Sequence, residues 1–277
     1  MTVMEQPGTA RHIEIATVVL PVDFSPLSWQ ALPLASHVAR RFGARLEPFH
    51  VDTASPWRDE ESATLHLRAT PFGRPVSVAV TASPDPVGGI VRFAAHDPRT
   101  LIAMSAHGHS GLGELAFGSV CEGVLRAADS TVLTVGPHFD VERHAFVRRV
   151  VACVDMTSGG EAIVPEAFGW ARALDVPLEL VTVQAHPSSS DSPDQEDAAR
   201  FEQLVRDLGA VDPRVGGLVL RGSRPAAEIV RHVTALRGTL LAMATHARPA
   251  IARTIVGSTA AAVLRHGPTG LLLCRRP

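Results

Sequence analysis

The sequence predicts an α/β protein made of two similar halves, each with a doubly wound, mainly parallel sheet of five strands. Short and nearly continuous apolar runs, such as residues 101–104, alternate along the chain with amphipathic segments. This alternation is typical of parallel strands joined by helices. The same order of segments starts again after Pro137, and 277 residues with a net charge of −2 suit two ordinary globular domains.

In the first half, a buried strand is predicted at residues 15–22, after a polar segment, residues 1–14, that we expect to be a loose tail. Ser25 can cap a helix that extends to residue 42, because Pro26 then occupies its first position. The polar stretch 55–74 is ambiguous, and we expect one short helix in it. The remaining predicted elements are strands at 46–51, 76–80, 101–104 and 131–135, and helices at 86–95 and from Ser119 onward.

The second half repeats this order of elements. A polar loop at residues 186–197 separates its second strand from its second helix. The predicted strands are at 149–154, 178–183, 215–220, 240–243 and 270–274, and the predicted helices are at 161–174, 198–208, 225–236 and 258–266.

Equivalent residues of the two halves lie at two constant spacings. Asp23 and Val51 recur 132 positions later, as Asp155 and Val183. A seven-residue insertion in the polar loop of the second copy then changes the spacing. The chain is therefore a duplication, with domains at residues 1–141 and 142–277. The later spacing is 139 positions for three pairs, Pro86 and Pro225, Met104 and Met243, and Gly118 and Gly257.

The composition excludes several kinds of site. The chain has no lysine and no asparagine, so a P-loop lysine, a Schiff-base lysine and an asparagine metal ligand are all excluded. The three cysteines are too widely spaced for a metal or disulfide pattern. We expect no metal site, because His107, His109 and His246 are typical of loop residues without a nearby acidic pair.

Location and macromolecular partners are also limited by composition. No apolar run reaches the length of a membrane span, and residues 1–11 lack the apolar core of a signal peptide. The nearly neutral net charge argues against nucleic acid as a partner. We therefore expect a cytoplasmic protein that binds neither membrane nor nucleic acid.

A glycine-dense loop follows the fourth strand of the first half. It contains Gly108, Gly111 and Gly113, and Gly118-Ser119 begins the next helix. Glycine permits close backbone approach, and a helix N-terminus offers unpaired N–H groups and the positive end of its dipole. The loop and helix start together suit a bound phosphate, at the strand ends where doubly wound sheets bind ligands.

These features resemble the universal stress protein family. Its nucleotide-binding members have an aspartate after the first strand and a G-x2-G-x9-G-(S/T) motif between the fourth strand and the last helix. The first copy reads Leu20-Pro21-Val22-Asp23-Phe24-Ser25 and then Ser105-x2-Gly108-x9-Gly118-Ser119. The second copy has Asp155 and reads Ala244-x2-Ala247-x9-Gly257-Ser258. The resemblance covers nearly all of both halves and implies a tandem member with the family's adenine nucleotide α-hydrolase-like fold.

The resemblance implies that the ligand is an adenine nucleotide, ATP, with Mg²⁺ as a counter-ion to its phosphates. Asp23 would accept from a ribose hydroxyl, Met104 would line the floor of the pocket, and Ser119 would hold phosphate. The implied contact residues are Pro21, Val22, Asp23, Val51, Met104, Ser105, Gly108, His109, Gly118 and Ser119 in the first copy, and Val154, Asp155, Val183, Met243, Ala244, Ala247, Gly257 and Ser258 in the second.

Departures from the motif fall mainly in the second copy. Ser105 replaces the first glycine of the first copy, whereas Ala244 and Ala247 replace both early glycines of the second. If these positions need a positive φ, each replacement costs about 1–2 kcal/mol. The first copy is therefore predicted to bind nucleotide more tightly.

Three other interpretations compete with ATP binding. Asp23 and Asp155 would serve only as helix caps in a structural pseudo-dimer with decayed sites that acts through an unknown protein partner. A cyclic nucleotide (cAMP) receptor would use the same crevice. A serine hydrolase is disfavoured, because Leu112 stands where the nucleophile elbow needs its last glycine. We expect no catalytic residues and at most slow, incidental ATP hydrolysis, in a stress-response or signalling role.

The two copies are expected to join through their last strands. The strands at 131–135 and 270–274 would otherwise be apolar sheet edges, which favour association. Single-copy relatives pair such edges between two chains, so the resemblance implies antiparallel pairing within this chain about a pseudo-two-fold axis. A further homodimer would then have to use helix faces.

Overall fold

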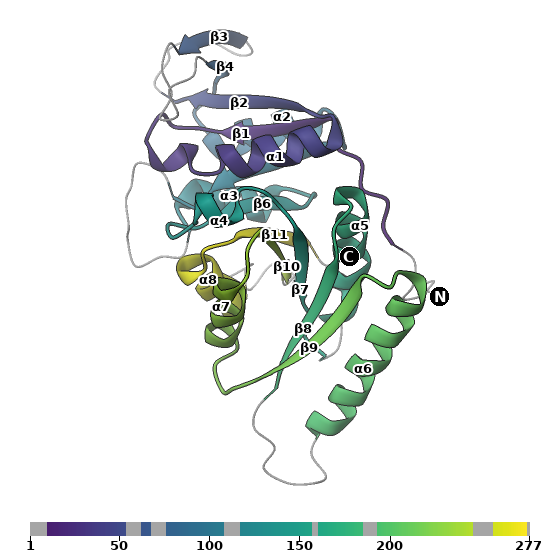
Figure 1. Cartoon of the computed structure of the whole chain (residues 1–277). Coiled ribbons are helices and arrows are strands. Elements are labelled where there is room, and N and C mark those ends of the chain that lie inside the picture. Colours follow the sequence, from purple (N-terminus) through teal and green to yellow (C-terminus); the bar gives the residue numbers. More distant parts are fainter. Residues whose placement is uncertain are drawn as a thin grey trace, which may run out of the picture.

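The computed structural model describes residues 10–53, 62–67, 76–107, 117–156, 160–184, 193–245 and 257–275. In these ranges one continuous sheet of 11 strands has the order β3-β4-β2-β1-β5-β6-β11-β10-β7-β8-β9 (Figure 1). Neighbouring strands run parallel except in the pairs β3–β4 and β6–β11. The α/β class and the mainly parallel pairing are confirmed, but the two predicted sheets are joined into one.

The first half extends from β1 to β6. The structure places its strands at β1 (Thr17–Pro21), β2 (Arg45–Asp52), β3 (Ser62–Leu67), β4 (Val76–Ala82), β5 (Thr100–Ser105) and β6 (Val132–Val135). Its helices are the 3₁₀ helix η1 (Leu27–Trp29), α1 (Leu32–Phe42), α2 (Pro86–Ala95) and α3 (Ser119–Ala127).

The second half repeats this arrangement after a short helix, α4 (Val141–His144). Its strands are β7 (Arg149–Cys153), β8 (Leu178–Gln184), β9 (Val215–Arg221), β10 (Thr239–Thr245) and β11 (Gly270–Arg275). Its helices are the 3₁₀ helix η2 (Gly160–Ile163), α5 (Val164–Leu174), α6 (Pro193–Val211), α7 (Pro225–Ala235) and α8 (Ser258–His266). Among the helices described, none combines the length and the apolar composition that a membrane span requires.

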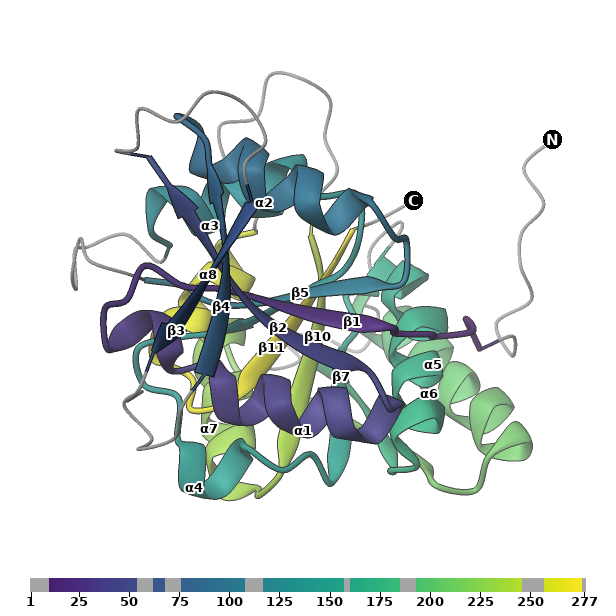
Figure 2. The same ribbon diagram turned by 90° about the horizontal axis from the view of Figure 1, so that it is seen from above.

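Two hydrophobic layers cover the faces of the sheet, and each layer extends across both halves. One layer packs α1, α5 and α6 on the sheet and contains Leu34, Phe168 and Phe201. The other packs α2, α3, α7 and α8 and contains Ile90 and Val263. Figure 2 shows α1 and α2 on opposite sides of the strands. Because both cores are shared, the halves are expected to unfold as one unit.

The seam between the halves is the antiparallel pair β6–β11, as predicted. Leu133 lies opposite Leu272, and both side chains are fully buried. Glu166 of α5 adds a polar contact across the seam, because it accepts hydrogen bonds from Thr131 Oγ1 at 2.8 Å and Trp170 Nε1 at 3.2 Å. The pairing removes the apolar edge that each half would otherwise expose.

The polypeptide before the first strand of each half crosses the seam. The Arg11 amide donates to the Pro165 carbonyl at 3.0 Å, and the Arg11 guanidinium pairs with Glu166 at 2.9 Å. In the other direction, Phe146 contacts His37 of α1. The prediction of a loose tail is therefore wrong for residues 10–14, and residues 1–9 lie outside the described residues.

Three further expectations differ from the structure. The stretch 55–74 contains β3 rather than a helix, because Ala63, Leu65 and Leu67 alternate with polar residues and the strand pairs with β4, so the first half has six strands. The helix expected from Pro26 is split into η1 and α1. The stretch between the predicted strands at 131–135 and 149–154, where no element was predicted, contains α4, which Asp140 caps by accepting from the Arg143 amide at 3.0 Å.

The two halves differ between their second and third parallel strands. The first half has β3 at this place, whereas the second half has the 19-residue helix α6. The predicted insertion therefore coincides with a change of element rather than only a longer loop. Its first residues, 185–192, lie outside the described residues.

Candidate functional site

Two cavities lie at equivalent places, at the carboxyl ends of the central parallel strands. β1 is paired with β2 on one side and β5 on the other, and β7 is likewise paired with β8 and β10. The chain therefore adds strands first on one side of β1 and then on its other side, and it does the same at β7. Doubly wound sheets bind ligands at such switch points.

The first cavity has a volume of about 280 Å³. Buried apolar side chains make most of its wall, among them Phe49, Val51, Ile90 and Met104. His107 and Ser105 are polar and also buried. Every described contact residue that the resemblance implied for the first copy lines this cavity, namely Pro21, Val22, Asp23, Val51, Met104, Ser105, Gly118 and Ser119.

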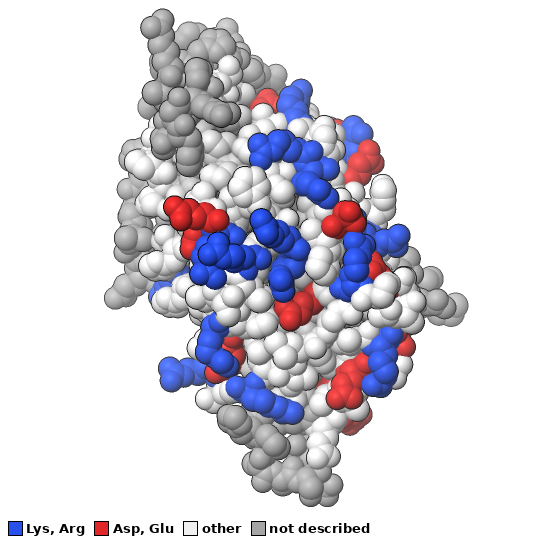
Figure 3. All heavy atoms as spheres, in the orientation of Figure 1, with Lys and Arg blue, Asp and Glu red and all other residues white. Residues whose placement is uncertain are grey.

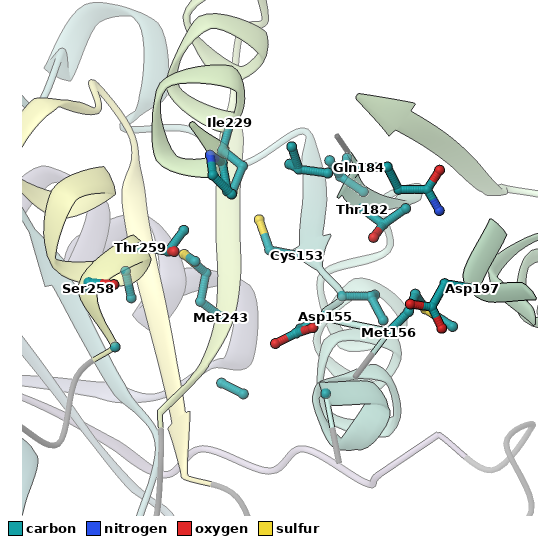
Figure 4. A pocket seen from close by; sticks show the side chains of 18 residues that line it. Cys153, Asp155, Met156, Thr182, Gln184, Asp197, Ile229, Met243, Ser258 and Thr259 are labelled. Carbon is teal, nitrogen blue, oxygen red and sulfur yellow. The ribbon is translucent and has the colours of Figure 1, made fainter. Parts of the chain in front are cut away.

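The second cavity is larger, about 380 Å³. Figure 4 shows Cys153, Asp155, Met243 and Ser258 around it, with Thr182, Gln184 and Asp197 toward α6. Every described contact residue implied for the second copy lines it, namely Val154, Asp155, Val183, Met243, Ala244, Gly257 and Ser258. Gly108, His109 and Ala247 lie outside the described residues.

Both cavities include the N-terminus of a helix without a side-chain cap. Gly118 precedes α3 and Gly257 precedes α8, and no side chain in the described ranges caps either helix start. Because glycine has no capping side chain, first-turn N–H groups are left for another acceptor. Each helix start therefore offers the anion-binding geometry that the sequence indicated.

Gly118 also has little room for a side chain. Its amide donates to the Ala106 carbonyl at 2.7 Å, and a Cβ at this position would lie 3.3 Å from the same carbonyl oxygen. Its φ of −69° is one that any residue adopts. Close backbone approach, not a left-handed conformation, is therefore the reason for glycine here.

Backbone strain was expected where other residues replace the first two glycines of the motif. It is absent at Ser105 and Ala244, the two of these positions that the structure describes. Ser105 lies in β5 opposite Val135, and Ala244 lies in β10 opposite Cys274. Neither has a positive φ. The strain prediction is wrong for these two residues, because both sit inside strands where a side chain is tolerated.

Asp23 has a local role in the turn after β1. Its Oδ1 accepts from the Ser25 amide at 3.0 Å and from the Ser25 hydroxyl at 2.6 Å. The Ser25 hydroxyl in turn accepts from the Ser28 amide of η1 at 3.2 Å. These contacts of Asp23 order the turn before η1 and do not cap the helix itself, and ribose contact stays a prediction.

An aromatic rim is present at the first cavity and absent from the equivalent positions of the second. Phe24 has a φ of +64°, and its ring lies tilted against that of His50 with ring centroids 4.4 Å apart; the His50 Nδ1 lies 2.8 Å from the Val22 carbonyl oxygen. The equivalents of Phe24 and His50 are Met156 and Thr182. A left-handed phenylalanine is unusual and indicates a local constraint at the mouth of the cavity.

Further wall residues of the second cavity come from the segment that differs between the halves. Asp197 of α6 lines the cavity, and Arg200 on the next turn donates to the Met156 carbonyl at 3.3 Å and pairs with Glu161 at 2.5 Å. These contacts fix α6 against the loop after β7. The sequence analysis missed Asp197 because the polar segment 186–197 had no counterpart in the first copy.

Both cavities contain a thiol that burial makes unreactive. Burial raises the pKa of Cys153 to about 12 and raises the pKa of Cys121 further, so neither is a thiolate near neutral pH. The Cys121 residue as a whole is buried, whereas Cys153 is half-buried and only its thiol is enclosed. Within the described ranges no group of three or more His, Cys, Asp or Glu side chains is arranged to hold a metal ion.

Other missed wall residues carried a signal in the repeat. Pro86 and Ile90 line the first cavity, and their counterparts Pro225 and Ile229 line the second. Both pairs recur at the 139-residue spacing. Applying the repeat to every apolar position, rather than only to the motif, would have found them.

Comparison with known proteins gives the same two-part division. A model of the universal stress protein family matches residues 14–136 and again residues 147–275. No protein of curated function matches the sequence.

Solved structures match over nearly the whole chain. A protein of unknown function from Pseudomonas aeruginosa PAO1 is 15% identical with a TM-score of 0.65, covering 95% of this chain and 93% of its own. A putative universal stress protein from P. aeruginosa UCBPP-PA14 is 16% identical with a TM-score of 0.64, covering 94% and 93%. A universal stress protein from Archaeoglobus fulgidus DSM 4304 is 19% identical with a TM-score of 0.65, covering 94% and 98%. At these identities the matches establish the fold.

Proposed function

The chain belongs to the universal stress protein family, with two copies in tandem, and we propose that it binds adenine nucleotide, with ATP as the ligand, in a stress-response or signalling role. The observation that carries this proposal is the pair of equivalent cavities, each combining apolar walls with an uncapped Gly-Ser helix start. Apolar walls suit a base, and free N–H groups at the positive end of a helix suit phosphate.

The first cavity is proposed as the tighter site. Phe49 and His50 stand where the second cavity has Val181 and Thr182. Phe49 is buried, and its ring stacks on Phe93 at 4.2 Å, so this wall is rigid. A fixed aromatic wall favours a planar base over a flexible ligand. Mg²⁺ bound to the phosphates would accompany ATP, and the residues described supply no protein cluster for it.

We propose binding rather than turnover. Asp23 is the one carboxylate among the described residues that line the first cavity, and it accepts hydrogen bonds from the Ser25 amide and hydroxyl. The thiols of both cavities have raised pKa values. These groups are suited to recognition and not to activating a nucleophile.

The proposal is tested by identifying what the purified full-length protein carries and prefers. Native and denaturing mass spectrometry should find an adenine nucleotide bound after purification, and calorimetric titration should rank ATP above GTP. Tighter binding of cAMP than of ATP would favour the cyclic nucleotide receptor. Absence of any nucleotide binding, with the protein folded, would contradict the proposal and favour a structural pseudo-dimer with decayed sites.

A further inference from the structure

A surface on the seam, away from both cavities, combines an exposed phenylalanine with several arginines. Phe146, between α4 and β7, is 57% exposed and meets His37 of α1 edge to face, with ring centroids 5.5 Å apart. Among the described residues, Phe146 is the most exposed of the three large hydrophobic side chains that face solvent, the others being Phe24 and Val211. The residues of this surface come from both halves.

Five arginines lie on the segments next to Phe146, namely α1, which carries His37, the stretch from α4 to β7, and the turn at Gly238. Arg40 and Arg41 lie about one turn after His37 on α1. Burial lowers the pKa of His37, and the charges of these two arginines lower it further. On the other side, the Arg148 amide donates to the Gly238 carbonyl at 2.7 Å, and Arg143 donates to the carbonyls of Thr234 and Leu236 at 3.0 and 3.1 Å. Arg237, the fifth arginine, is exposed and directly precedes Gly238. Figure 3 shows blue side chains across the middle of this face, over α1 and α4. We call Phe146 with these five arginines the Phe146 surface.

None of the arginines of the Phe146 surface has an ion pair with a carboxylate among the described residues. Within the described part of the chain, Arg41 and Arg143 bond only to backbone carbonyls, and Arg40, Arg148 and Arg237 have no ion pair. The acidic residues nearest in sequence are Asp140, which caps α4, and the exposed Glu142. Arginines elsewhere that do pair with carboxylates are Arg11, Arg45, Arg99, Arg126, Arg200, Arg206, Arg214 and Arg231.

We infer that the Phe146 surface docks an acidic segment of a partner protein that carries an apolar side chain to cover Phe146. Arginine and aromatic residues dominate the energetics of protein interfaces. Guanidinium groups without an internal partner can form paired hydrogen bonds with carboxylates. The surface spans both halves, so such a partner would recognise only the assembled tandem protein.

A single-stranded nucleic acid fits this surface less well. Proteins that bind such strands use successive aromatic side chains to stack successive bases. Here Phe146 is one ring, and the tryptophans Trp29 and Trp170 are both buried. The chain as a whole carries a net charge of −2. A carboxylate-rich peptide is therefore the occupant favoured by the structure.

The test uses the full-length protein and a fluorescein-labelled peptide, Glu-Glu-Leu-Glu-Glu-Phe-Glu-Glu, followed by fluorescence anisotropy. Binding is expected at low ionic strength and should weaken as salt is raised to roughly 0.3 M. Phe146→Ala, and separately Arg237→Glu, should each weaken binding by about tenfold or more. Arg237 is exposed, and its side chain makes no hydrogen bond or ion pair with the other described residues, so its replacement reports on charge independently of folding.

Arg206→Glu is the matched control. Arg206 is an exposed arginine on α6, far from this surface in the chain, and its replacement makes the same charge change. It should leave peptide affinity unchanged. No peptide binding by the folded protein, equal losses in Arg206→Glu and Arg237→Glu, or displacement of the peptide by an oligothymidylate of about twelve nucleotides at lower concentration than by unlabelled peptide would each overturn the inference.

Discussion

The first and second cavities occupy equivalent places on one sheet, yet their walls are different. Both have an aspartate after the first strand of their half and a Gly-Ser start to the last helix. The first cavity has the smaller volume and is lined by the aromatic residues Phe49 and His50. The second has the larger volume and is lined in part by Asp197 of α6. The backbone features that suit phosphate are therefore shared, and the side chains that would meet the base are not.

This difference shows which parts of a duplicated site the fold constrains. The helix starts are fixed by β5–α3 and β10–α8, which belong to the shared core. The outer wall of the second cavity takes Asp197 from α6, at the place between the second and third parallel strands where the first half has β3. Loops and insertions are free to vary on a rigid scaffold, and specificity varies with them.

The largest expected effect is a loss of stability at the β6–β11 seam, which joins the two halves. Leu133→Pro should remove a ladder donor in a strand paired on both sides, at a cost of about 3 kcal/mol or more of unfolding free energy. Because both cores extend across the seam, calorimetry should find one transition shifted to lower temperature. Two separate transitions, with the second half retaining its original melting temperature, would show that the halves are independent.

The next effect separates the two phosphate sites. Gly118→Val should weaken ATP binding on the order of a hundredfold, about 2.7 kcal/mol, because the new side chain crowds the Ala106 carbonyl and the helix start. Gly257→Val should have a much smaller effect on the tight site. Titration calorimetry measures both, with melting temperatures as the control for folding. Similar losses in the two variants would contradict the ranking of the cavities.

A smaller effect separates the two aspartates. Asp23→Ala should cost about 1.5–3 kcal/mol of ATP affinity, the usual contribution of a hydrogen bond to a charged group. Asp155→Ala should cost less, and 2′,3′-dideoxy-ATP should be less sensitive to Asp23→Ala than ATP is. Normal ATP affinity in Asp23→Ala, with lower thermal stability, would mean that Asp23 serves only the turn at Ser25.

The smallest effect separates two equivalent histidines. Burial lowers the pKa of His144 below its ordinary 6.5, and its Nδ1 accepts from the Thr239 amide at 3.2 Å. The folded state thus favours the neutral ring, so its contribution is present above pH 6.5 and is lost as the pH falls toward the lowered pKa. Its counterpart in the first copy, His12, is exposed. Urea unfolding from about pH 8 to about pH 5 should be less pH-dependent in His144→Asn than in the unchanged protein, and His12→Asn should have no such effect.

Sequence reasoning located the scaffold and the cavities because the information is local and repeated. Asp23, Met104 and Gly118 each recur at a constant spacing, and parallel topology brings them to one edge of the sheet. β3 was missed because its short alternation is diluted by polar neighbours. The left-handed Phe24 and the arginines around Phe146 were missed because they depend on tertiary contacts that no local pattern encodes.

Equilibrium dialysis of the full-length protein against ATP shows whether the two equivalent cavities are unequal nucleotide sites. We expect a first plateau at one nucleotide per chain, followed by weak binding at the second site. The first plateau should disappear in Gly118→Val and persist in Gly257→Val. Two equal sites, or a plateau that only Gly257→Val removes, would contradict this expectation.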